Sequence, residues 1–221
     1  KLLKNNGSLG VILGTLIISE SGELKNSLIG LGTTKGIYDK KYLVPFGEYV
    51  PLSGVFDRFF NFFNFNRPSI IAGEGTSLLG DDFIKISPAI CYEIAYQETY
   101  LKNSDTSNLL LNASNDNWFG KTIGPYQHLQ IARFRAAENQ KYLIRSTSTG
   151  ISAFINDKGK IISKTNIAKK NVPSESLKEK VILKSGQTPF SKMGKNPFIY
   201  FLIIIFFVST ILKFRNNVFD N

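Results

Sequence analysis

The sequence predicts an α+β domain, a layered sandwich of many strands and few helices over about residues 1–185, followed by a single transmembrane helix. Short β-branched runs separated by turn residues recur as far as residue 164, which favours strands over helices. No repeat of about 20–50 residues is present, so a solenoid or propeller is not expected. Residues 197–212 contain no charged side chain, which is typical of a membrane span.

The predicted strands share apolar and β-branched runs bounded by Gly, Asn, Asp or Ser. They cover residues 9–19, 27–32, 42–44, 83–87, 108–112, 142–146, 151–156 and 160–164. The first two are expected to pair as a hairpin after a Ser-Gly-Glu turn, and the last two across an Asp-Lys-Gly turn. Residues 126–140 predict a helix with Pro125 in its first turn.

The apolar segment near the C-terminal end is interpreted as one transmembrane helix over residues 197–214. Its core, PFIYFLIIIFFVSTIL, is flanked by Lys192 and Lys195 before it and by Lys213 and Arg215 after it. These long basic side chains can extend to the membrane interfaces. The segment falls a little short of the roughly 20 residues of a full span, so a buried core helix is the alternative. Residues 186–196 are then a linker, and 215–221 a tail.

The charge distribution favours a membrane partner over nucleic acid. The chain of 221 residues carries a net charge of +10, and residues 121–221, with 17 basic and 5 acidic residues, hold all of the excess. This basic half adjoins the apolar segment and contains no nucleic-acid recognition motif. Because Cys91 and His128 are the sole cysteine and histidine, an internal disulfide and a Cys/His zinc site are excluded. We expect no metal and no cofactor.

Cys91 is the candidate nucleophile. It ends the β-rich run FIKISPAICYE, and a nucleophile on the bend beyond a strand is open to substrate and close to backbone N–H groups. The alternative is an inert, buried cysteine. Glu93 lies two residues further on and is hard to explain by packing, because glutamate is almost never fully buried unless it is paired.

Three other segments carry candidate functional residues. Lys40 and Lys41 precede a Pro-Phe-Gly turn and Glu48, and a lysine near a thiol favours the thiolate and can stabilise an oxyanion. Trp118 lies in the polar loop NASNDNWFG, which is either a structural turn or the rim of a site. Residues 55–65 contain six phenylalanines, which indicate either a core helix or an aromatic arm that contacts a bilayer or an acyl chain.

Taken together and in order, five motifs resemble those of the bacterial apolipoprotein N-acyltransferases. They are LVPFGEYVP at 43–51, AICYE at 89–93, SNDNWFG at 114–120, GPYQHLQIARFRAAE at 124–138 and RSTSTGISAFI at 145–155. The TPF at 188–190 before a terminal hydrophobic helix agrees with the same family. The resemblance implies a nitrilase-like αββα sandwich on the outer, periplasmic side of the bacterial inner membrane.

The resemblance also implies an activity. These enzymes transfer an acyl chain from a phospholipid, through a cysteine thioester, to the free amine of diacylglyceryl-cysteine in an apolipoprotein. Cys91 matches the nucleophile, and Lys40 matches the triad lysine because it stands eight residues before Glu48. Glu48 and Glu93 match carboxylates that support catalysis. We expect phospholipid, apolipoprotein and membrane as partners, no nucleic acid, and a monomer.

Further positions are carried over from the family in the same way. Glu138 matches a third supporting carboxylate, and Tyr92 and Trp118 match aromatic positions around the acyl site. The triad glutamate of the family follows a Trp-Pro pair, which this sequence lacks, and neither Glu20 nor Glu23 is assigned to that role. We therefore expect the chain to be the C-terminal part of a longer enzyme.

Two other functions remain open from the sequence. A carbon–nitrogen hydrolase, an amidase or nitrilase, would use the same cysteine and lysine to hydrolyse a small amide. An inactive, membrane-tethered binding module would keep the fold without the chemistry. The apolar C-terminal segment and the phenylalanine-rich stretch argue against a soluble hydrolase.

Overall fold

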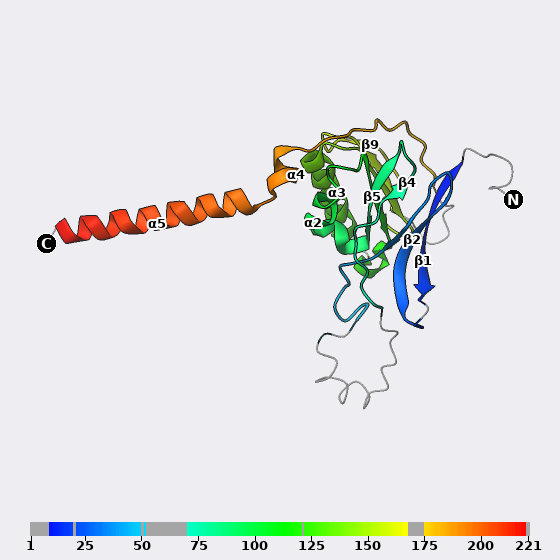
Figure 1. Ribbon diagram of the computed structural model, residues 1–221, viewed down its shortest axis with the longest axis horizontal. Coiled ribbons are helices and arrows are strands. Elements are labelled where there is room, and N and C mark those ends of the chain that lie inside the picture. The colour runs from blue at the N-terminus through cyan, green and yellow to red at the C-terminus, as the bar shows by residue number, and fades with distance from the viewer. Residues whose placement is uncertain are drawn as a thin grey trace, which may run out of the picture.

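The computed structural model of this protein describes residues 9–19, 21–49, 51, 70–120, 122–167 and 175–219. Two sheets and a group of helices form a body from which a long C-terminal helix projects (Figure 1). The layered α+β architecture predicted from the sequence is confirmed. The phenylalanine-rich stretch 55–65 lies outside the described residues.

The first sheet is three-stranded and antiparallel, in the order β1 (Gly10–Ile18), β2 (Leu24–Gly32) and β3 (Ile37–Asp39). The hairpin between β1 and β2 is confirmed, with the Ser19 N–H donating to the Glu23 carbonyl at 2.8 Å. The strand predicted at 42–44 is wrong. Those residues form an irregular loop because the Val44 N–H donates to the Glu48 carboxylate instead of to a strand.

The second sheet has six strands in chain order. They are β4 (Leu79–Gly80), β5 (Lys85–Ile90), β6 (Leu109–Ser114), β7 (Leu143–Thr147), β8 (Ala153–Ile155) and β9 (Ile161–Lys164). β5, β6 and β7 run parallel, and the other pairs are antiparallel. The parallel centre explains why β6 begins LLLN without alternation, since both faces of such a strand are buried.

The body also contains one long helix and several short ones. They are η1 (Cys91–Ala95), α2 (Glu98–Leu101), η2 (Asp116–Phe119), α3 (Gly124–Asn139) and α4 (Pro189–Met193). α3 confirms the predicted helix, and Gln140 ends it in the left-handed conformation. The short helices escaped prediction because a helical period needs more than one turn to show itself.

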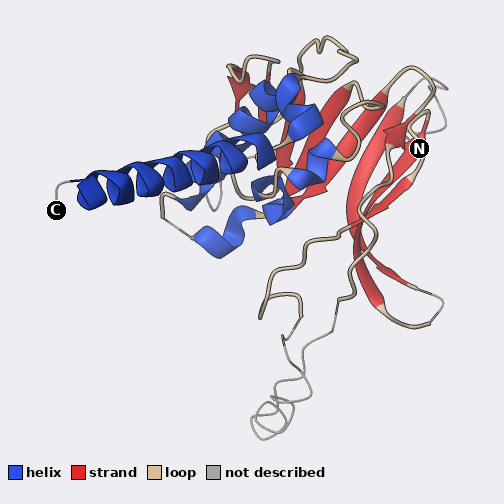
Figure 2. Cartoon of the chain, turned by 60° about the vertical axis from the view of Figure 1, so that its left-hand side comes forward, coloured by secondary structure: helices blue, strands red, loops and turns tan. Residues whose placement is uncertain are grey.

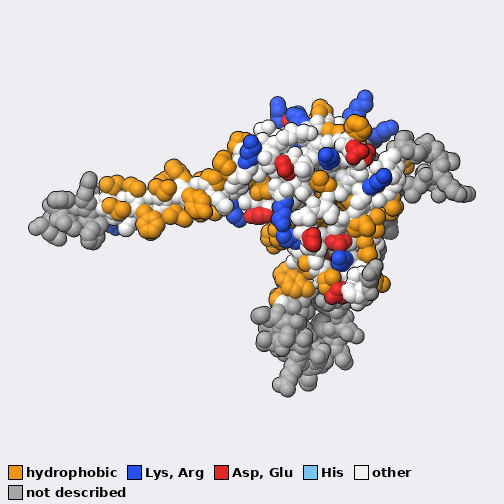
Figure 3. Space-filling model, in the orientation of Figure 1, with side chains coloured by type: hydrophobic (Ala, Val, Ile, Leu, Met, Phe, Trp, Pro, Cys, Tyr) orange, Lys and Arg blue, Asp and Glu red, His pale blue; other side chains and the backbone are white. Residues whose placement is uncertain are grey.

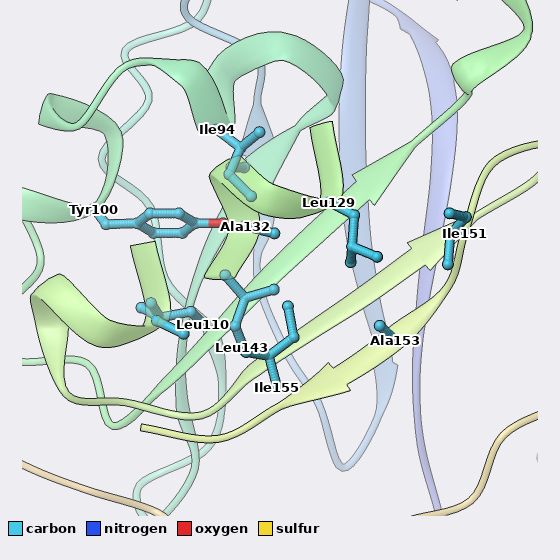
Figure 4. Close-up of a cluster of buried hydrophobic side chains, with 11 residues drawn as sticks. Ile94, Tyr100, Leu110, Leu129, Ala132, Leu143, Ile151, Ala153 and Ile155 are labelled. Atoms are coloured by element: carbon cyan, nitrogen blue, oxygen red, sulfur yellow. The ribbon is translucent and has the colours of Figure 1, made fainter. Parts of the chain in front are cut away.

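Two hydrophobic cores separate three layers, in the order helix, six-stranded sheet and three-stranded sheet (Figure 2). One core lies between α3 and the six-stranded sheet, where Leu129 and Ala132 face Leu143 and Ile155 (Figure 4). The other joins the two sheets. On β1 the apolar side chains of Leu13, Leu16 and Ile18 remain exposed, so no described helix covers them.

The C-terminal helix α5 (Asn196–Phe219) extends away from the body (Figure 1). Its segment Asn196–Lys213 has a mean hydropathy of 1.9 and is not buried anywhere in the molecule. Exposed apolar side chains cover its segment 198–212 (Figure 3). This exposure contradicts the alternative of a buried core helix, and by length and composition α5 is able to cross a membrane.

The segment that precedes α5 is packed on the body. The Lys184 ammonium pairs with the Asp157 carboxylate, and the Lys184 N–H donates to the Asn108 carbonyl at 3.0 Å. Further on, the Thr188 hydroxyl caps α4 and also donates to the Glu138 carbonyl at 2.6 Å. Part of the stretch expected to be a linker, 186–196, is therefore a short helix attached to the end of α3.

Candidate active site

Cys91 lies where β5 ends and η1 begins, and its backbone is in the left-handed region with φ 53°. Side-chain-bearing residues rarely adopt this conformation, which costs about 1–3 kcal/mol and is concentrated at functional sites. The residue is half-buried. A sharp strand-to-helix turn of this kind presents a nucleophile at the carboxyl end of a parallel strand.

Glu93 anchors the Cys91 turn from within. Its side chain is fully buried, and one oxygen, Oε1, accepts the N–H groups of Lys41 at 2.7 Å and Tyr42 at 3.0 Å. The other oxygen accepts the N–H of Ile90 at 2.7 Å and the Tyr38 hydroxyl at 3.0 Å. Burial raises the pKa of Glu93 above its ordinary value, against the effect of these donors. The carboxylate thus joins the Cys91 turn to the segment that carries Lys40.

Lys40 forms a buried ion pair with Glu48. Its side chain is 1% exposed, and Nζ lies 2.6 Å from Glu48 Oε2, which also accepts the Val44 N–H at 2.8 Å. The Asn26 amide donates to the other oxygen of Glu48 at 3.0 Å. Burial raises the pKa of Glu48, but these donors and the Lys40 charge outweigh it, so the pKa lies below its ordinary value. Lys41, by contrast, places Nζ 5.5 Å from the centre of the Tyr42 ring.

Aromatic side chains surround the Cys91 turn. Tyr96 stacks on Tyr42 with ring centres 4.5 Å apart, and Tyr92 meets Tyr96 edge to face at 6.1 Å. Tyr92 and Tyr96 are both exposed, as is Trp118 in η2, at 81%. Tyr92 follows Cys91 directly in the chain, and Trp118 is exposed and does not pack in the interior.

Glu138 lies near the C-terminal end of α3 and is linked to η1 through Arg135. The two side chains form an ion pair, and the Arg135 guanidinium donates to the carbonyls of Ile94, at 2.9 Å, and Ala95 at the end of η1. Burial raises the pKa of Glu138, and the Arg135 charge opposes that rise. Glu138 is thus placed to support η1.

Sequence reasoning missed a buried polar cluster beneath the turn, formed by Asn112, Asp116, His128 and Arg145. From the sequence alone, His128 enters the argument against a Cys/His zinc site and receives no other role. A signal was nevertheless present, because His128 shares the helix face of Leu129, Ala132 and Ala136, and a polar side chain on a buried face needs partners. Within the described part of the chain, no group of three or more His, Cys, Asp or Glu side chains is arranged to hold a metal ion.

The site therefore combines a half-buried cysteine on a left-handed turn, the Glu93 carboxylate that joins this turn to the next segment, and the Lys40–Glu48 ion pair, all carried by two stacked sheets. A sequence model of the carbon-nitrogen hydrolase family matches residues 3–178, and the chain belongs to this family.

Curated relatives are more specific. The chain is 38% identical over 208 residues to the apolipoprotein N-acyltransferase of Haemophilus influenzae, and 39% identical over 206 residues to that of Pasteurella multocida. These matches cover 89% and 88% of this chain but 39% of each relative. The chain therefore spans about two fifths of the length of these enzymes.

Solved structures support the fold. The Saccharomyces cerevisiae protein Nit3, a member of branch 10 of the nitrilase superfamily, aligns with a TM-score of 0.54 at 17% identity over 71% of this chain and 55% of its own. A carbon-nitrogen hydrolase from Helicobacter pylori aligns with a TM-score of 0.55 at 15% identity over 74% and 60%. The nitrilase-like fold predicted from the sequence is confirmed.

Proposed function

We propose that this chain carries the nucleophile half of an apolipoprotein N-acyltransferase, with Cys91 as the residue that takes up the acyl group. The observation that carries the proposal is the connection made by Glu93, which joins the strained Cys91 turn to the segment with the buried Lys40–Glu48 pair. The curated relatives and the exposed apolar helix α5 support a lipid substrate over a small soluble amide.

The first half-reaction takes the acyl group from a phospholipid. The Cys91 thiol gives its proton to a base and the thiolate attacks the ester carbonyl. The ester C–O bond breaks, and the base returns the proton to the oxygen of the leaving lysophospholipid. An ammonium has three N–H donors, and one from Lys40 goes to Glu48, which leaves two for the developing oxyanion. Glu48 holds Lys40 in place, and an acyl-thioester on Cys91 remains.

The second half-reaction passes the acyl group to an amine. The amine of diacylglyceryl-cysteine attacks the thioester carbonyl, the C–S bond breaks, and an amide forms while Cys91 is regenerated. Glu48 and Glu93 already accept several hydrogen bonds, and Glu138 pairs with Arg135. These three are therefore assigned to support, and the proton acceptor is sought in a carboxylate outside this set.

The membrane supplies the first substrate. We place α5 across the bilayer. We place Tyr92 and Trp118 at the rim where an acyl chain would enter, because both are exposed and such amphipathic aromatic rings favour the boundary between lipid and water. Lys213 and Arg215 in the short tail favour a cytoplasmic tail and a periplasmic catalytic domain, whereas Lys192 and Lys195 favour the opposite.

The test uses mass spectrometry of the full-length protein after incubation with phospholipid. The expected result is a fatty-acyl adduct on the peptide containing Cys91, removed by hydroxylamine and absent from a Cys91→Ala variant. An adduct that persists in Cys91→Ala would overturn the assignment of the nucleophile.

A second candidate function follows from the family itself, because carbon-nitrogen hydrolases act on amides. If it holds, the wild-type protein will form no lipid adduct but will release ammonia from small amides in a reaction that Cys91→Ala abolishes.

A further inference from the structure

The carbonyl of Cys91 points into a buried polar cluster that the proposed chemistry does not use. His128 Nε2 lies 3.2 Å from this carbonyl oxygen, and the Asn112 amide nitrogen also lies 3.2 Å from it. Both side chains are at most 2% exposed. The backbone of the nucleophile is therefore held from below by side chains of α3 and β6, which lie 37 and 21 residues away in the chain.

The contacts of His128 determine which of its nitrogens donates to the nucleophile turn. Nδ1 lies 3.0 Å from Asp116 Oδ1 and 3.0 Å from an Arg145 guanidinium nitrogen. A neutral ring accepts from Arg145 at Nδ1, and a protonated ring donates to Asp116 there. In both forms Nε2 carries the hydrogen, because its partner is a carbonyl oxygen that can only accept.

Asp116 and Arg145 form the fixed base of this arrangement. The Arg145 guanidinium lies 2.7 Å from Asp116 Oδ2 and also donates to the Asn112 side chain. Burial raises the pKa of Asp116, but His128, Arg145 and the Ser114 hydroxyl outweigh it and lower the pKa to about 2. The carboxylate is therefore charged at neutral pH, and β7, η2 and α3 each contribute one member of the cluster.

The ring of His128 also contacts η1, which begins at Cys91, and η2, which carries Trp118. Its centre lies 6.4 Å from that of Tyr92, in η1, and 5.7 Å from that of Phe119, in η2. Asp116 is itself the first residue of η2. His128 thus connects the turn that carries Cys91 with the loop that carries Trp118.

We propose that His128 is a positioning residue, which donates from Nε2 to the Cys91 carbonyl and thereby holds the nucleophile in its left-handed turn. Asp116 and Arg145 orient the ring for this bond. The inference rests on the proposed role of Cys91 as nucleophile. Without the donor, the strained turn loses one of the bonds that hold it, and the thiol moves away from the position set by Glu93 and Lys40.

Two substitutions of His128 by amide side chains test the contacts of Nε2 and of Nδ1 separately. In His128→Gln, the longer side chain places an N–H donor near the position of Nε2. In His128→Asn, the amide is near Nδ1, where it can bind Asp116 and Arg145 but is too short for the Cys91 carbonyl. Both variants keep polar partners for the buried charges. Ile155→Val in β8 serves as a control for a core change away from the turn.

Two rates are measured on the full-length protein. One is alkylation of Cys91 by iodoacetamide, quantified on its peptide, and the other is formation of the phospholipid-derived acyl adduct. We expect His128→Asn to lower both by about 10- to 100-fold with an unchanged KM for phospholipid, and His128→Gln to restore most of the loss. Ile155→Val should leave both rates within about twofold of wild type, since it removes one methyl group from the core and no hydrogen-bonding group.

The outcomes are separable. A wild-type protein that forms no acyl adduct refutes the proposed function, yet the alkylation rates still test the inference. Equal alkylation rates in His128→Asn and the wild type would overturn the inference alone. The inference is overturned as well if His128→Gln and His128→Asn lose activity equally. If the cluster only supported the fold, the longer glutamine side chain, which reaches the Cys91 carbonyl, would restore no more activity than asparagine.

Discussion

At the scale of single residues, the difference between Lys40 and Lys41 is the most direct consequence of the structure. The two are neighbours in the chain, but Lys40 is buried against Glu48 and Lys41 lies over Tyr42. We expect Lys40→Ala to lower the rate of acyl-enzyme formation by about 10²- to 10³-fold, the usual cost of losing one oxyanion donor.

Lys41→Ala is the matched control for this prediction and should stay within a few-fold of wild type. Single-turnover measurement of the Cys91 adduct gives both rates. Equal losses in the two variants would show that the buried ion pair has no special role in the reaction. Because Lys40→Ala leaves Glu48 without its cation, the folded fraction of each variant must be determined alongside.

Glu93 is a second residue whose role follows from its partners. In Glu93→Gln, an NH₂ group must face either the N–H groups of Lys41 and Tyr42 or that of Ile90. Leaving buried donors unpaired costs about 1–3 kcal/mol each. We therefore expect Glu93→Gln to lower the free energy of unfolding by at least that amount.

The control for Glu93 is Tyr38→Phe, which removes a single hydroxyl donor and leaves the three N–H bonds in place. Its expected cost is about 1 kcal/mol. Urea unfolding in detergent, followed by circular dichroism, compares the two variants. A Glu93→Gln variant as stable as Tyr38→Phe would mean that the carboxylate does not hold the turn.

The lowered pKa of Asp116 predicts how the free energy of unfolding depends on pH. Its pKa in the folded protein is about 2, below the ordinary value of 3.8, so its contribution to stability is present above pH 4 and is lost as the pH falls through 2. The contribution is on the order of 2 kcal/mol. The gap in unfolding free energy between wild type and Asp116→Asn should therefore narrow by about this amount between pH 5 and pH 2. A constant gap over this range would contradict the prediction.

At the scale of elements, the hairpin between β8 and β9 depends on a glycine. Gly159 has φ 72°, and a Cβ there would lie 2.7 Å from the carbonyl oxygen of Arg133 in α3. Gly22, in the β1–β2 hairpin, has φ 81° but nothing within 4 Å of the corresponding Cβ. Alanine at either site adds backbone strain, and only at Gly159 does it add a clash.

We expect Gly159→Ala to lower the unfolding free energy by about 1–2 kcal/mol more than Gly22→Ala does, because it must separate the hairpin from α3. Thermal unfolding of the two variants in parallel measures this difference. Similar melting temperatures would show that the hairpin can move away from the helix at no cost.

At the scale of the whole molecule, α5 is set apart from the body by its exposed apolar surface (Figure 3). A membrane span and a water-exposed helix respond differently to a central charge. In Ile204→Arg the arginine would cost about 2.5–3.5 kcal/mol at the middle of a bilayer and almost nothing in water. Flotation of the chain with phospholipid vesicles is the measurement, and we expect the variant to remain bound to a smaller extent.

The control is Ser209→Arg, nearer the end of the segment, where the long side chain can reach the interface and the loss should be smaller. Unchanged flotation of Ile204→Arg would exclude α5 as a membrane span.

The sequence by itself determined what local patterns encode. The β1–β2 hairpin, α3, the terminal apolar helix and the position of Cys91 at the end of a strand all follow from residue periods, turn residues and side-chain type over short stretches. The family motifs added the expectation of a nitrilase-like fold, which the comparisons support.

Only the tertiary structure decided which polar groups meet. Glu93 binds backbone groups about 50 residues before it, and His128 reaches the Cys91 carbonyl 37 residues away, and no local pattern records such pairings. The misplaced strand at 42–44 has the same cause, because the Glu48 carboxylate takes the Val44 N–H that a strand would use. Buried polar groups must find partners wherever the fold brings them, so the contacts around Cys91 become visible only once the layers are packed.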